Sequence, residues 1–145
     1  MEKYQGIIFA CIVGLSLGLQ PAINSTLGKH LTPKVAAFHS IFISFIIITA
    51  VALFSRELNL YKNILDINPI YWIGGIFGAC IVLLSIITVP LLGASVSMAL
   101  FVTVQLITSA VLDHFGLLGI AATPLTPLKV LGIIVLIIGV KLILI

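Results

Sequence analysis

The sequence predicts an all-α integral membrane protein with five transmembrane helices. Hydrophobic residues make up 61% and charged residues 8% of the 145 residues, whereas soluble domains have roughly 45–50% and about 25%. Mean hydropathy is +1.37. Five apolar runs each approach the roughly 17–25 residues that a helix needs to cross a ~30 Å hydrocarbon core. The runs lack the alternation of barrel strands, and backbone groups in lipid must be satisfied within the segment, so helices are expected.

We expect one transmembrane domain over residues 1–145, with helices at about 6–24, 34–55, 69–90, 94–113 and 127–145. Three helix starts carry a capping residue followed by proline: Thr32-Pro33, Asn68-Pro69 and Thr126-Pro127. The capping side chain can accept from free backbone N–H groups, and proline takes a position where its missing N–H costs nothing. These starts are therefore predicted more sharply than by hydropathy alone.

The first helix ends in a polar stretch, QPAINSTLG. Ser16, Gln20 and Asn24 are spaced by four and share one helix face. Pro21 lacks an N–H and clashes with the carbonyl of Leu17, which frees that carbonyl. These groups would be costly in lipid unless they face protein, water or a ligand. We therefore expect this face to line a polar cavity.

A second polar face is predicted on the fourth helix, where Ser97, Phe101 and Gln105 are also spaced by four. A glutamine facing lipid is costly, so Gln105 is expected to point into the same interior as Gln20. An interhelical hydrogen bond that only holds the bundle together, typically worth ~0.6 kcal/mol, explains the same residue. Both roles stay open at this point.

The third and fifth helices carry fewer polar residues. Gly74 and Gly78 in the third helix predict a packing surface, with a kink at Pro90. The fifth helix is expected to be peripheral or dimer-forming, with Lys141 reaching to the interface.

Ionisable side chains are rare within the apolar runs. His39, two turns into the second helix, is the one titratable side chain expected at depth, and Asp113 ends the fourth helix. Both are candidates for proton sensing, because imidazole titrates near neutrality and intramembrane acids commonly carry protons. The ordinary alternatives are that His39 is neutral and hydrogen-bonded, and that Asp113 contacts lipid headgroups or a loop. Without a central carboxylate, the expected site is polar and uncharged.

Other function classes find no support in the sequence. It has no paired carboxylates at depth, no His/Cys metal spacing and no phosphate-binding loop, so no enzyme, cofactor or metal site is expected. The isoelectric point is about 9.1, but the seven Lys and Arg residues are spread over separate loops. Membrane lipids, rather than nucleic acid, are the expected partners.

The charge distribution predicts weak control of orientation. One side of the membrane would hold four positive residues and the other three: Lys3, Arg56, Lys62 and Lys129 against Lys29, Lys34 and Lys141. Because Lys/Arg asymmetry sets orientation, a difference of one predicts insertion in both directions. An inverted second copy would then give a ten-helix body with an inverted repeat. A fixed orientation with a weak bias is the alternative.

Several motifs resemble those of the YdcZ-like family of small five-helix proteins in the drug/metabolite transporter superfamily. They are QPAINSTLG, GGIFGA, PLLGAS and QLITSAVLDHFGLLG, followed by a proline-rich link and LGIIVLIIGVKLI. The resemblance implies half of a ten-helix inverted-repeat transporter in the inner membrane, paired with an antiparallel copy or a homologue. It places Gln20 and Asn24 in the first helix and Gln105 and Asp113 on the fourth. The first helix lacks the glutamate of the small multidrug resistance relatives, so their proton-swap export of cations is not expected.

The sequence thus predicts a secondary transporter that exports a small organic molecule. It would act as an antiparallel dual-topology homodimer, with alternating access around a polar uncharged cavity. Two alternatives remain: a dual-topology small-ion channel, with Phe101 contacting the ion, and a membrane assembly subunit that transports nothing.

Overall fold

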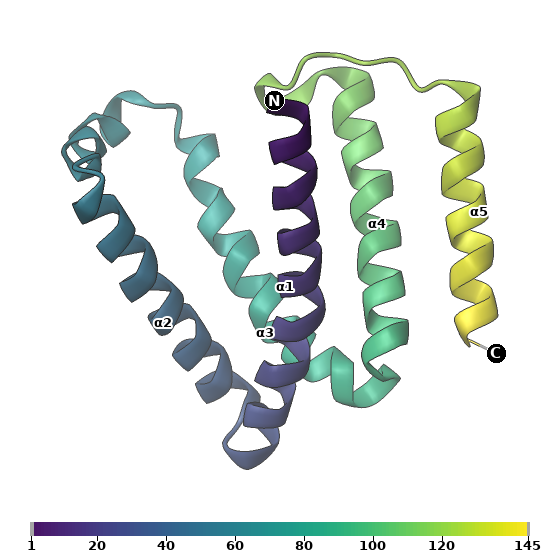
Figure 1. The fold of residues 1–145 in the computed structure, drawn as a ribbon, viewed down its shortest axis with the longest axis horizontal. Coiled ribbons are helices and arrows are strands. Elements are labelled where there is room, and N and C mark those ends of the chain that lie inside the picture. Colours follow the sequence, from purple (N-terminus) through teal and green to yellow (C-terminus); the bar gives the residue numbers. More distant parts are fainter. Residues whose placement is uncertain (1, 145) are drawn as a thin grey trace. The chain divides into compact units, whose positions relative to one another are not determined.

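The computed structural model describes residues 2–144, and this part of the chain is all-helical (Figure 1). Its long helices are α1 (Glu2–His30), α2 (Pro33–Phe54), α3 (Gly74–Leu92), α4 (Ala94–Phe115) and α5 (Pro127–Leu144). Three 3-10 segments lie between them: η1 (Leu58–Asp66), η2 (Pro69–Ile73) and η3 (Leu117–Gly119). Five helices are long and apolar enough to cross a membrane, the third of them formed by η2 together with α3. The predicted five-helix membrane fold is confirmed.

The three predicted capping residues each accept a backbone N–H. The bonds are Val35 N to Thr32 Oγ1 at 3.3 Å, Ile70 N to Asn68 Oδ1 at 3.1 Å, and Lys129 N to Thr126 Oγ1 at 3.3 Å. In each case proline follows the cap, so the first turn loses no donor that an internal bond would use. At Asn68 the capped turn is the 3-10 segment η2, and the α-helix itself begins at Gly74.

Helix α1 continues through Pro21 to His30, beyond the predicted end near residue 24. The hydroxyls of Ser25 and Thr26 both donate to the carbonyl of Ala22, at 2.9 and 3.1 Å. Side chains that bond within their own helix let a polar stretch remain helical. The polar stretch is therefore part of the first helix and not of the following connection.

The chain forms two compact units, residues 1–91 and 92–145. In the first unit, α1 and α2 converge at their connection and diverge away from it (Figure 1). The core at the convergent end is small: Ala36, Ala37 and Ile86, with Leu27, Val82 and Leu83 packed against it. A Cβ atom added to Gly28 would lie 2.8 Å from Ile86 Cγ2. Small residues thus allow close packing here.

This packing corrects the expectation for the third helix. A Cβ atom at Gly74 or Gly78 would meet no described atom within 4 Å. The buried residues of α3 are instead Ser85, Ile86 and Val89, in its second half. Gly74 and Gly78 therefore take no part in the close packing of the first unit.

In the second unit, α4 and α5 lie side by side (Figure 1). Gly116 ends α4 with a φ of 61°, and its N–H bonds to the carbonyl of Leu112. Glycine adopts this left-handed conformation without steric cost, which makes it a common helix stop. The connection then folds back, because Thr123 N donates to the carbonyl of Asp113 at 2.7 Å.

Most residues of each spanning helix are not buried. Only 6–17% of the residues in the most apolar window of each span are buried. Apolar side chains of this kind suit lipid tails or a second protein chain. The expectation of one transmembrane domain stays a prediction.

Candidate functional site

The polar face of α1 meets a hydroxyl group on α2. Asn24 Nδ2 donates to Ser40 Oγ at 2.9 Å, and Gln20 Nε2 donates to the same oxygen at 3.5 Å. Asn24 is 7% exposed, Ser40 is half-buried and Gln20 is exposed. We call these three residues the amide cluster. It joins two helices through neutral groups.

The amide cluster lies well inside the span of α2. Ser40 is seven residues beyond Pro33 in a helix of 22 residues, which corresponds to about 10 Å along a helix of about 33 Å. The three-helix core around Ala36 and Ala37 lies one turn closer to the helix start. Packing of small residues therefore holds α1 and α2 close enough for the amides to bridge them.

The amide cluster has hydrogen-bonding capacity left over. Serine has one donor and two acceptor positions, and both amides donate to Ser40, whose own O–H donates to no described residue. Among the described residues no buried side-chain polar atom lacks a partner. The amide oxygen of Asn24 accepts no hydrogen bond from them and is therefore open to the surroundings. The cluster offers both donors and acceptors to a neutral polar molecule.

Ser16 lies one turn from Gln20 on α1 but does not join the amide cluster. Its hydroxyl donates to the carbonyl of Ile12, in its own helix, at 2.9 Å. It is exposed. Its polar group is satisfied locally, so the structure brings together two of the three predicted α1 residues.

The predicted residues of α4 make no interhelical hydrogen bond within the described chain. Ser97 is 0% exposed and donates to the carbonyl of Gly93, in its own helix, at 2.7 Å. Phe101 is half-buried and Gln105 is exposed. The Gln105 amide has no hydrogen-bond partner among residues 2–144. That Gln105 and Gln20 share one interior stays a prediction.

The two candidates for proton sensing take no part in the hydrogen bonds of the amide cluster. His39 is exposed on α2, next to Ser40 in sequence. Asp113 is half-buried at the end of α4, where its backbone carbonyl accepts from Thr123. The Asp113 side chain lines a cavity between α4 and α5.

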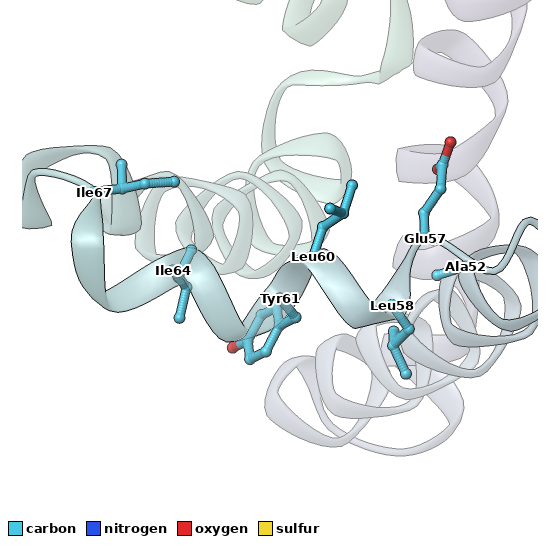
Figure 2. Close-up of a pocket in the computed structure, with 7 residues that line it drawn as sticks. All are labelled: Ala52, Glu57, Leu58, Leu60, Tyr61, Ile64 and Ile67. Atoms are coloured by element: carbon cyan, nitrogen blue, oxygen red, sulfur yellow. The ribbon is translucent and has the colours of Figure 1, made fainter.

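Two cavities stand out. The first, of about 220 Å³, is formed by η1 and the end of α2 (Figure 2) and contains no predicted site residue. Its lining is Ala52, Glu57, Leu58, Leu60, Tyr61, Ile64 and Ile67. The second, of about 330 Å³, lies between α4 and α5, and Asp113 is the one predicted residue in its lining.

Within the described part of the chain, no group of three or more His, Cys, Asp or Glu side chains is placed to hold a metal ion. Cys11 and Cys80 are free and exposed. The residues that could bind a small molecule are the neutral amides and hydroxyl of the amide cluster, together with Asp113 and Lys129, which both line the second cavity.

Sequence reasoning missed Ser40, the residue that joins the two amides. A signal was present, because Ser40 and Ser44 are spaced by four in FHSIFISF, an otherwise apolar part of α2. The Ser44 hydroxyl donates to the carbonyl of Ser40 at 2.9 Å. Such local bonding is the usual role of a helical serine, so the spacing alone did not single out Ser40.

The fold defines a small multi-pass membrane protein, and comparison with known families identifies its family. Residues 5–142 match the family model described as "Putative inner membrane exporter, YdcZ". The match covers nearly the whole chain, so the protein belongs to this family of inner membrane exporters, and the resemblance inferred from its motifs is confirmed. The family is a class of transporters and not a class of enzymes. No curated protein and no solved structure matches the chain.

Proposed function

We propose that the protein exports a small, polar organic molecule by alternating access, and that the amide cluster lines the substrate cavity. The observation that carries this proposal is the convergence of Gln20 and Asn24 on Ser40. This convergence leaves one hydroxyl donor and two amide oxygens for a ligand. No charged side chain takes part, so a neutral polar group is the best match.

The strength of these hydrogen bonds suits a transport cycle. Hydrogen bonds between membrane helices average about 0.6 kcal/mol, close to the thermal energy. The bond from Gln20 is long, at 3.5 Å, so a ligand hydroxyl or amide can replace it at little cost.

We further propose that the transporting unit is an antiparallel homodimer. Gln105 lacks a partner among the described residues, and a lone amide is costly in lipid. A second copy in the opposite orientation supplies protein surface for it and produces the inverted repeat of ten-helix transporters. The near balance of four against three positive charges supports insertion in both orientations.

A stabilisation screen tests the site. Purified protein is heated with a library of polar metabolites and amphiphiles, because a ligand of the folded state raises the unfolding temperature. A compound that stabilises the wild type should lose its effect with Ser40→Ala and keep it with Ser44→Ala, the matched control on the same helix. Equal responses of the two variants would remove Ser40 from the site.

Tagging both termini tests the antiparallel arrangement. In intact cells, each tag should be accessible from outside on a fraction of the molecules, since both orientations are made. If all molecules expose the same terminus, the antiparallel homodimer is wrong. Five helices also require that the two termini of one molecule never label together from one side.

A further inference from the structure

The cavity between α4 and α5, which we call the α4–α5 pocket, is lined by two charged residues, two hydroxyl residues and otherwise apolar residues and glycine. One face of α4 lines it from Leu106 to Asp113, and one face of α5 from Lys129 to Leu136. Thr123 from the connecting segment lines the same pocket. Its volume of about 330 Å³ is within the roughly 300–1,000 Å³ of small-molecule sites.

The two charged residues lie at the same end of this pocket. Asp113 is near the end of α4 and Lys129 near the start of the adjacent α5. Leu106 precedes Asp113 by seven residues on α4 and Leu136 follows Lys129 by seven on α5, so each leucine is about 10 Å along its helix from the charged residue. The two charged residues therefore mark one end of the pocket, and Leu106 and Leu136 mark the other.

Neither the Asp113 carboxylate nor the Lys129 ammonium takes part in the hydrogen bonds that hold the connecting segment. In the connecting segment, Thr123 N donates to the backbone carbonyl of Asp113 at 2.7 Å, and Leu125 N donates to the ring nitrogen Nδ1 of His114 at 3.4 Å. Among residues 2–144, no hydrogen bond reaches the carboxylate of Asp113 or the ammonium of Lys129. Asp113 and Lys129 thus line one pocket, and neither charged group has a hydrogen-bond partner among the described residues.

Gly132 keeps the pocket open on the α5 side. It lines the pocket, and a Cβ atom built on it would meet no described atom within 4 Å. A larger side chain at this position would occupy the pocket without striking the backbone. A substitution at Gly132 is therefore a direct way to fill the α4–α5 pocket.

We propose that the α4–α5 pocket binds a phosphoethanolamine group, with the phosphate on Lys129 and the ammonium on Asp113. The ligand carries one anion and one cation two carbons apart, and the pocket presents one charge of each sign. A ligand with only one charge would leave Asp113 or Lys129 without a counter-ion. The apolar wall from Leu106 to Leu136 suits an acyl chain when the group belongs to a phospholipid. This site is independent of the amide cluster.

The test compares ligands that differ at one group. The unfolding temperature of detergent-purified protein is measured with phosphatidylethanolamine, phosphatidylcholine and phosphatidylglycerol of identical chains, and with soluble phosphoethanolamine. Phosphatidylcholine keeps the positive charge but has no N–H to donate, and phosphatidylglycerol has no cation. We expect phosphatidylethanolamine to bind about tenfold more tightly than either, because charge-assisted hydrogen bonds to Asp113 are lost in the others.

Variants then locate the effect. Asp113→Asn should remove the preference for phosphatidylethanolamine over phosphatidylglycerol, and Lys129→Gln should weaken binding of all three lipids. Gly132→Leu should abolish binding. Gly139→Leu, on the same helix and also free of neighbours within 4 Å, should retain it, as should Ser40→Ala.

The outcomes separate the two sources of the group. Stabilisation by the lipid alone assigns the pocket to a phospholipid headgroup, and equal stabilisation by soluble phosphoethanolamine assigns it to the free compound. The proposal is overturned if phosphatidylethanolamine and phosphatidylcholine stabilise the wild type equally, a comparison that needs no variant. Unchanged binding to Gly132→Leu would also overturn it.

Discussion

The polar residues of α1 and those of α4 are spaced alike in sequence but are bonded differently. On α1, Gln20 and Asn24 donate across to Ser40 of another helix. On α4, Ser97 bonds within its own helix and Gln105 bonds to no described residue. The first face therefore makes its interhelical hydrogen bonds inside one unit of the chain. The second face needs something from outside its own helix, which is where we place the second copy.

The largest loss of stability is expected from overfilling the three-helix core next to the amide cluster. Gly28→Ala places a methyl group 2.8 Å from the Ile86 Cγ2 atom, and Ile86 is 1% exposed and β-branched, so it yields little. Overpacking of this kind costs about 1–3 kcal/mol. Unfolding of purified protein should show this loss for Gly28→Ala and not for Gly18→Ala, which has open space around it. Equal stability of the two variants would mean that the helices are not closely packed here.

A smaller effect is expected from the hydroxyl that joins the two amides. Ser40→Ala removes the acceptor for both of them and should cost about 0.6 kcal/mol, up to about 1.7, the range for hydrogen bonds between membrane helices. Thr103→Val on α4 removes a hydroxyl that bonds only to the carbonyl of Ala99, so its cost should be near zero. A double-mutant cycle of Ser40→Ala with Asn24→Ala isolates the bond. The absence of coupling between the two sites would contradict the amide cluster.

The comparison also predicts a difference in how the two glutamines act. Gln105→Leu should leave the stability of the single chain unchanged and shift the monomer–dimer equilibrium toward monomer by about threefold, equivalent to one hydrogen bond of ~0.6 kcal/mol. Sedimentation in detergent at several protein concentrations measures this shift. If Gln105→Leu dimerises as strongly as the wild type, the Gln105 amide has no role at the dimer interface.

The smallest predicted change concerns orientation. Lys34→Gln changes the balance of positive charges from four against three to four against two, and Arg56→Gln changes it to three against three. Because the excess of Lys and Arg marks the cytoplasmic side, these two variants should shift the fraction of accessible N-terminal tags in opposite directions. A shift in the same direction for both would contradict the predicted assignment of loops to sides.

The sequence was most informative where one physical rule dominates. Apolar length predicted the five spans, and the threonine–proline and asparagine–proline pairs predicted three helix starts, because lipid and helix capping leave few alternatives. The end of α1 was less predictable. The hydroxyls of Ser25 and Thr26 donate to the carbonyl of Ala22 within the same helix, so the polar stretch stays helical. Serine can bond locally or across helices, so Ser40 could not be distinguished from Ser44 by spacing.

Packing between helices was the least predictable feature. The glycine pair at Gly74 and Gly78 has the spacing of a contact surface, but the core forms around Ala36, Ala37 and Ile86. Which small residues meet depends on helix directions that a linear pattern does not contain. The α4–α5 pocket likewise depends on how the segment around Thr123 folds back onto α4.

The central claim is that the amides of α1 and α4 border a wet interior within the membrane. Single cysteines at positions 20 and 105, in a background with Cys11 and Cys80 replaced by serine, can be reacted with a membrane-impermeant maleimide. The control is Phe45→Cys, at an exposed apolar position in the middle of α2. We expect Gln20→Cys and Gln105→Cys to label from the aqueous phase much faster than Phe45→Cys. If both react as slowly as that control, the amides face lipid or dry protein, and the substrate cavity proposed here is wrong.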